Sequence, residues 1–107
     1  MSPAIRQGAL ALLEAQASQA ARLMGLFANR QRLVLLCRLS AGEARVNELA
    51  AFAGLSQSAC SQHLARLRQE GVVKRRRQAQ TAYYSLVDPT AARLVGALCD
   101  IFGGDAT

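Results

Sequence analysis

The fold is decided by residues 47–86, which read NELAAFAGLSQSACSQHLARLRQEGVVKRRRQAQTAYYSL. An apolar segment at 48–53 is short enough to be a helix of two turns. Gly54 then breaks it, and a longer segment at 57–69 begins behind Ser56, a residue that caps helices well. Two helices joined by so tight a turn have the form of a helix-turn-helix.

The ends and faces of these two helices can be assigned from side-chain chemistry. Asn47 is expected to cap the first helix, and Leu55 with Cys60 occupies the two positions of a hydrophobic staple at the start of the second. Cys60, Leu64 and Leu67 form a stripe that should face inward. The residues left facing outward are Gln57, Ser58, Ser61, Gln62, Ala65 and Arg66, and all except Ala65 supply an amide, a hydroxyl or a guanidinium.

This outward face suits DNA because it is polar and carries no acidic group. The second helix of such a motif lies in the major groove, where Gln62 could pair with adenine and Arg66 with guanine or a phosphate. His63, the single histidine, sits beside the inward stripe, so packing and a phosphate contact are equally good interpretations. One histidine cannot build a multi-histidine metal site within one chain.

A basic β-hairpin is predicted directly after this helix. Residues 72–77 and 81–86 are rich in β-branched, aromatic and long basic side chains, as strands are. The tip at 78–80 lacks an Asn-Gly pair and should be a loose turn. The first strand carries the densest charge run of the chain, Lys74, Arg75, Arg76 and Arg77. Because strand residues alternate faces, one pair of these is expected on DNA and the other toward solvent or a second subunit.

The flanking segments read as helices and complete the fold class. One long helix is expected over 3–27, a second over 30–40 capped by Asn29, and a last one from Asp88 to about residue 102. We therefore predict a mainly α protein with a β-hairpin, a dimeric winged helix-turn-helix formed as one domain by all 107 residues. The Ala-rich first helix and the apolar last helix should form the homodimer interface.

Composition limits the possible functions. The chain has 13 Lys+Arg, 7 Asp+Glu and a formal charge of +6, which favours a polyanionic partner. Three cysteines cannot all pair within the chain, which argues for a reducing cytoplasm. No signal peptide, membrane span or enzyme motif is recognisable, so we predict a cytoplasmic protein with no membrane partner, no cofactor and no catalytic residues.

Residues 26–88 resemble the ArsR family of winged-helix transcriptional repressors, and LSQSACSQHLARLRQEGVV at 55–73 is the most specific part of the match. The resemblance implies a homodimer built by the first and last helices. It also implies an inducer that loosens binding to an operator. One family metal site has a Cys-x-Cys pair at the position of residues 46–49, which hold no cysteine here. Another uses carboxylates and histidine on the last helix, where this chain has Asp88 and Asp100 but no histidine, so no metal site is expected.

The resemblance is closest to the thiol-sensing branch of the family, which responds to persulfides or oxidants. Cys37 stands where that branch has one cysteine, which makes Cys37 and Cys99 candidate sensing thiols. The branch's second cysteine lies one helical turn beyond Cys99, at Gly103 here, and one turn is about 5 Å along the axis. A direct disulfide tolerates little such displacement, so buried core cysteines are the stronger interpretation.

Two alternatives to a thiol-switched repressor remain open at the sequence level. Some winged helices bind proteins, although the arginine-rich hairpin argues against this. A DNA-binding regulator without a thiol switch would also fit. If the switch exists, a persulfide donor is the better inducer, because a longer sulfur chain could span a gap between Cys37 and Cys99.

Overall fold

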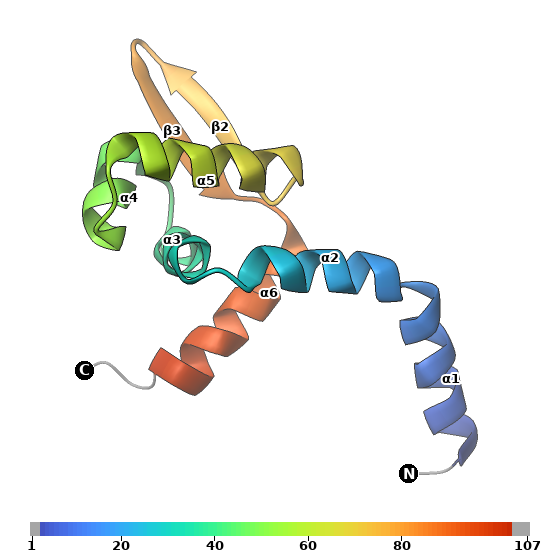
Figure 1. Ribbon diagram of the computed structural model, residues 1–107. Helices are drawn as coiled ribbons and strands as arrows, with labels where there is room; N and C mark the ends of the chain where they lie inside the picture. Colours follow the sequence, from blue (N-terminus) through green and yellow to red (C-terminus); the bar gives the residue numbers. More distant parts are fainter. Residues whose placement is uncertain (1–2, 104–107) are drawn as a thin grey trace.

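The computed structural model describes residues 3–103, with side chains from residue 7 onward. The elements are α1 (Pro3–Ala15), α2 (Ala17–Phe27), α3 (Arg30–Ser40), β1 (Ala44–Arg45), α4 (Val46–Ala53), α5 (Gln57–Gln69), β2 (Val73–Gln78), β3 (Thr81–Leu86), α6 (Pro89–Leu98) and the π-helical turn η1 (Cys99–Gly103). Figure 1 shows α4 and α5 stacked above α3, with the β2–β3 hairpin projecting beyond α5. The predicted winged helix-turn-helix is confirmed.

Three predicted helix caps are present with the expected hydrogen bonds. The side chains of Asn29, Ser56 and Asp88 accept from the backbone N–H three residues later, at 3.0, 3.0 and 2.8 Å. Gly54 ends α4 with φ of 68°, a left-handed conformation that glycine adopts without a steric cost. The turn between α4 and α5 is therefore defined by local contacts at both ends, by Gly54 where α4 ends and by Ser56 where α5 begins.

The helix boundaries differ from the predictions in three places. The long first helix breaks at Gln16, because α2 packs into the core through Leu26 and Phe27 whereas the described side chains of α1 are exposed. Helix α4 begins at Val46 instead of after Asn47, since the Glu48 carboxylate accepts the Arg45 N–H at 3.1 Å and caps the helix. The last helix ends at Leu98 and continues as the wider π turn η1.

The sheet is larger and its hairpin tighter than predicted. The strand order is β1-β3-β2, so the two-residue β1 adds a third strand that the sequence did not indicate. Strand β2 runs to Gln78, which pairs with Thr81, and this leaves a two-residue tip. The expectation of a loose tip was wrong because Ala79 adopts a positive φ of 57°, the conformation a tight turn needs.

The core lies between α3 and the faces of α4, α5, α6 and the sheet that point toward it. Leu35, Leu36, Leu49, Leu64 and Leu67 are fully buried within it. The predicted inward stripe of α5 is confirmed, because Cys60 is also fully buried there. Helix α5 is thus held on one side by apolar packing, which leaves its other side exposed.

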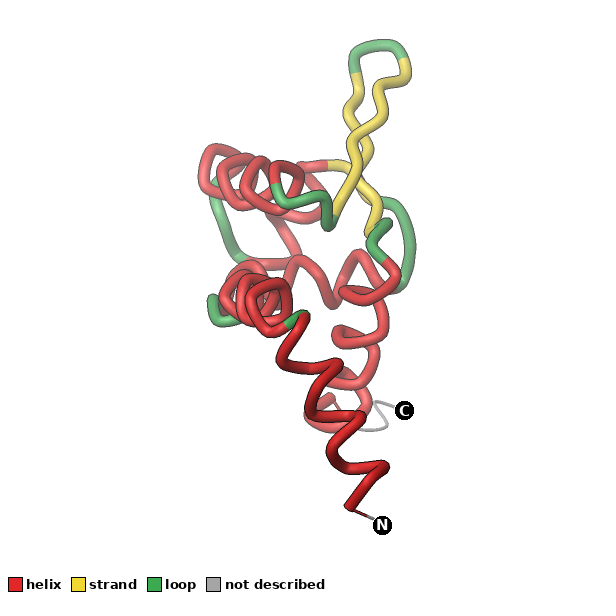
Figure 2. Tube along the Cα trace, turned by 90° about the vertical axis from the view of Figure 1, so that its right-hand side faces the viewer, coloured by secondary structure: helices red, strands yellow, loops and turns green. Residues whose placement is uncertain are grey.

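The N-terminal helix projects away from this core (Figures 1 and 2). The radius of gyration is 16.1 Å, against about 13 Å for a compact chain of this length. Leu10, Leu12 and Leu13 on α1 are each at least half exposed, as are Ile101 and Phe102 at the other end of the chain. Within residues 3–103, no helix is long and apolar enough to cross a membrane.

Candidate nucleic-acid interface and thiol junction

The outward side of α5 is exposed as the sequence predicted, and we call its polar residues the reading face: Gln57, Ser58, Ser61, Gln62 and Arg66. Ser56 and the staple residue Leu55 fix where this helix starts, and Leu64 fixes its rotation by pointing into the core. His63 is half-buried at the edge of this face. No acidic side chain lies on α5, so the reading face presents only neutral donors, acceptors and a cation.

The hairpin β2–β3, which we call the wing, stands beside the reading face because α5 packs against β2. The sequence-predicted cations Lys74, Arg75, Arg76 and Arg77 are all exposed on β2. The register shows that they divide between the two faces of the sheet. Arg75 lies opposite the buried Tyr84, whereas Arg76 lies opposite Tyr83 on the outer face.

Arg76 differs from the other three cations because its guanidinium is already engaged. Its Nε and Nη2 donate to the two carboxylate oxygens of Glu43 at 3.0 and 2.8 Å, and its Nη1 donates to Gln78 at 2.9 Å. The guanidinium carbon lies 4.5 Å from the centre of the Tyr83 ring, a cation–π distance. Hydrogen bonding to Arg76 holds the pKa of the Glu43 carboxyl below its usual value, so both groups are charged. Sequence reasoning missed Glu43 because it precedes Arg76 by 33 residues.

The two candidate sensing cysteines, Cys37 on α3 and Cys99 at the start of η1, meet in what we call the thiol junction. The Sγ atoms of Cys37 and Cys99 are 3.1 Å apart, and Cys99 donates to Cys37. The expected gap of a helical turn is therefore absent, and no longer sulfur chain is needed to join the two thiols. Leu33, Leu98 and Phe102 line an apolar hollow beside them.

Burial keeps the Cys37 thiol protonated at neutral pH. Desolvation by burial, together with the interaction with the neighbouring Cys99 thiol, raises the pKa of the Cys37 thiol to about 11. The third cysteine, Cys60, is enclosed in the core, and burial raises its pKa as well. Cys37 and Cys99 are half-buried, so of the three thiols these two are reachable from solvent.

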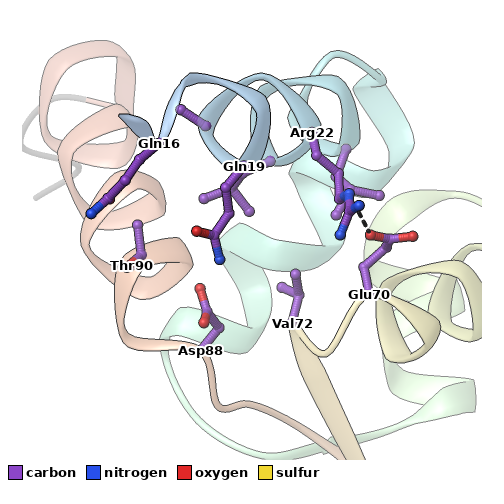
Figure 3. Close-up of a pocket in the computed structure, with 10 residues that line it drawn as sticks. Gln16, Gln19, Arg22, Glu70, Val72, Asp88 and Thr90 are labelled. Carbon is purple, nitrogen blue, oxygen red and sulfur yellow. Dashed lines mark ion pairs between the residues drawn. The ribbon is translucent and has the colours of Figure 1, made fainter. Parts of the chain in front are cut away.

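A separate polar cleft of about 220 Å³ lies between α2, the start of β2 and the start of α6. Figure 3 shows Gln19 and Asp88 pointing into it, with Arg22 and Glu70 paired at its edge. The Arg22–Glu70 distance is 3.7 Å, and Asp88 is already used as the cap of α6. The cleft shares no residue with the reading face, the wing or the thiol junction. Among the described residues, no three His, Cys, Asp or Glu side chains are grouped as a metal site would require.

Comparison with known proteins identifies relatives over most of the chain. Residues 29–75 match the model of the arsR family of bacterial regulatory proteins. The transcriptional activator HlyU of Vibrio cholerae is 46% identical over 74 residues, which are 69% of this chain and 68% of HlyU.

Two solved structures extend the comparison. The crystal structure of the transcriptional repressor BigR from Xylella fastidiosa is 39% identical with a TM-score of 0.80, and the match covers 84% of this chain and 92% of BigR. The solution structure of Mb0332 from Mycobacterium bovis is described as a homodimeric winged helix-turn-helix DNA-binding domain. It is 31% identical with a TM-score of 0.72 over 82% of each chain.

Proposed function

Since the chain belongs to the arsR family of bacterial regulatory proteins, we propose that it is a DNA-binding transcriptional repressor, not an enzyme, whose homodimer binds an inverted-repeat operator. The observation that carries the proposal is the exposed polar reading face beside the cationic wing. Both present hydrogen-bonding groups and positive charge on one side of the molecule, as contact with duplex DNA requires. The location that follows from a DNA partner is the cytoplasm.

Dimerisation is supported by apolar surface that one protomer leaves uncovered. Leu12 on α1 is 67% exposed and Phe102 on η1 is 82% exposed. Mb0332, which shares the fold, is described as homodimeric. A twofold axis between the protomers would place the two reading helices on one side of the DNA, about 34 Å apart, in successive major grooves. An inverted-repeat operator follows from that symmetry.

The inducer in this proposal oxidises the thiol junction. Joining the two sulfurs releases two protons and two electrons to the oxidant and forms one disulfide. A persulfide donor achieves the same result in two steps: it transfers a sulfur to one cysteine and leaves as a thiol. The second cysteine then attacks the inner sulfur and expels hydrogen sulfide. The 3.1 Å separation of the two sulfurs supports direct closure by either route.

Closure of the thiol junction would act on DNA through the helices that carry it. Cys37 lies on α3, against which α4 packs, and Cys99 begins η1 beside the exposed Phe102. A covalent link would favour one arrangement of the dimer over the other, and DNA affinity would fall by the coupling free energy between the two states.

The test measures binding of duplex DNA by the reduced and the oxidised protein. A labelled duplex pool is enriched for bound sequences, and the selected operator is titrated at several salt concentrations. We expect an inverted repeat, a log–log salt slope of about −0.9 per neutralised phosphate, and a change of base preference with Gln62→Ala. Salt-independent binding would contradict the DNA proposal and would favour a protein-interaction module.

The inducer is tested separately with the same operator. Diamide or a persulfide donor should weaken binding at least fivefold, with the loss of two hydrogens by mass spectrometry, and Cys99→Ser should abolish both effects. Unchanged binding by the cross-linked protein would identify a constitutive regulator. Because HlyU is named an activator and BigR a repressor, the direction of regulation is decided by a reporter gene under the selected operator.

A further inference from the structure

Arg76 reaches across the whole sheet, which an ordinary surface ion pair does not do. It lies on β2 directly opposite Tyr83 of the central strand β3. Glu43 immediately precedes β1, the strand on the far side of β3. The Arg76 guanidinium therefore passes over the Tyr83 ring and donates hydrogen bonds to both carboxylate oxygens of Glu43. Bidentate geometry of this kind orders both partners.

We propose that Glu43 and Arg76 form a brace that sets the angle of the wing against the helix-turn-helix, and that Arg75 and Arg77 are the wing residues that contact phosphates. The brace acts on α4 because β1 runs directly into that helix. Arg76 is thus a positioning residue, contrary to its prediction as a DNA contact. This inference rests on the proposed function, since it concerns the same DNA interface.

The sheet register assigns the phosphate contacts to the other two arginines. Arg75 pairs with Tyr84 and Arg77 with Ala82, so both lie on the face of the sheet that covers the core and on which α5 packs. Both are exposed, and no ion pair or side-chain hydrogen bond involves either within the described part of the chain. Lys74 shares the outer face with Arg76. The available cations nearest the reading face are therefore Arg75 and Arg77.

The brace and simple electrostatics predict opposite changes in DNA affinity for a substitution of Glu43. Glu43→Gln removes one negative charge, which should strengthen binding to a polyanion if charge alone matters. Loss of the brace instead lets the wing move in the free protein. Ordering the wing on DNA then costs free energy, so the affinity for DNA falls. Glu70→Gln makes the same change of charge at the edge of the polar cleft, which shares no residue with the reading face or the wing, and serves as the matched control (Figure 3).

The first experiment measures fluorescence anisotropy of a labelled duplex of about 30 base pairs across a salt series. We expect Glu43→Gln and Arg76→Gln to weaken binding about fivefold with the salt slope unchanged, and Glu70→Gln to have no effect. Arg77→Gln should reduce the slope by about 0.9, because it loses one phosphate contact. Glu43→Gln binding as tightly as the wild type, or a reduced slope for Arg76→Gln, would overturn the brace.

A charge swap keeps the net charge of the wild type and separates the two roles further. Glu43→Arg combined with Arg76→Glu restores an ion pair across Tyr83 at the net charge of the wild type, so we expect the double variant to bind within about twofold of the wild type. A loss of about fivefold or more in the double variant would assign Arg76 to a phosphate contact instead. Thermal melting by circular dichroism checks that each variant is folded. No binding of any duplex by the wild type would defeat the proposed function itself, a different outcome from failure of the brace.

Discussion

The reading face and the thiol junction are built in different ways. The reading face and wing come from one continuous stretch, residues 57–86, in which each element follows from its neighbours. The thiol junction joins two residues that are 62 positions apart, on helices that meet only in the folded chain. A surface made of local elements can be predicted in kind from sequence, whereas a contact between distant helices depends on how they pack.

The largest expected difference between the two regions is in the free energy of unfolding, when a core side chain behind the reading face is removed. Leu64 is fully buried, so Leu64→Ala should lower the free energy of unfolding by about 2–5 kcal/mol. Cys37→Ala removes a smaller, half-buried side chain and should cost less than about 2 kcal/mol. Urea unfolding with equal m-values measures both. Equal losses would mean that the thiol junction is as much a part of the core as α5 is.

Reactivity should distinguish the thiol junction from an exposed cysteine by about a hundredfold. With the Cys37 pKa raised from 9.0 to about 11, the thiolate fraction at neutral pH falls by two powers of ten, because a raised pKa favours the protonated, unreactive form. Alkylation of Cys37 by iodoacetamide, followed by peptide mass spectrometry, should still accelerate between pH 9 and 10. A plateau below pH 9 would show that burial does not protect this thiol.

On α5, the effect of removing an arginine on operator binding should depend on which side of the helix it occupies more than on the charge lost. Arg66→Ala removes a cation from the reading face and should weaken operator binding by about 1–3 kcal/mol. Arg68→Ala removes the same charge from another side of the same helix and should have a much smaller effect, since long-range attraction is screened. Titration of the operator with both variants at one salt concentration makes the comparison. Similar losses would indicate attraction by net charge without specific contacts.

The smallest effect is expected in the polar cleft, which belongs to neither region. Arg22 has a 73% exposed side chain and lies 3.7 Å from Glu70. Arg22→Ala should therefore change the free energy of unfolding by less than about 0.5 kcal/mol and leave operator binding unchanged. A large loss of DNA affinity in this variant would show that the cleft communicates with the reading face.

Much of the fold could be predicted because its signals are local. Asn29, Ser56 and Asp88 cap helices with their own side chains, and each was recognised from residue type and position. The inward stripe of α5 followed from helical spacing and is buried as expected. The residues assigned to DNA contact stay predictions, although the exposure of all of them except the half-buried His63 agrees with that role.

The features that escaped prediction all depend on distant partners or uncommon backbone. Arg76 reads as one of four equivalent cations until Glu43 is brought beside it by the pairing of β1 with β3. From sequence, Cys99 lies one helical turn before Gly103, the position at which the thiol-sensing branch has its second cysteine. In the structure Cys99 nevertheless contacts Cys37, at the point where α6 ends and the π turn η1 begins. Ala79 adopts a positive φ that no local sequence signal announced.

If two protomers pair through α1, as proposed, the concentration of the protein in the cell becomes a regulatory variable. A lone protomer must hold Leu10, Leu12 and Leu13 in water, and pairing removes that cost. In the dilute limit the concentration of dimer rises with the square of the protomer concentration, so occupancy of a weak operator would respond steeply to synthesis and turnover. The melting temperature should rise with protein concentration for the same reason, because mass action favours the paired form.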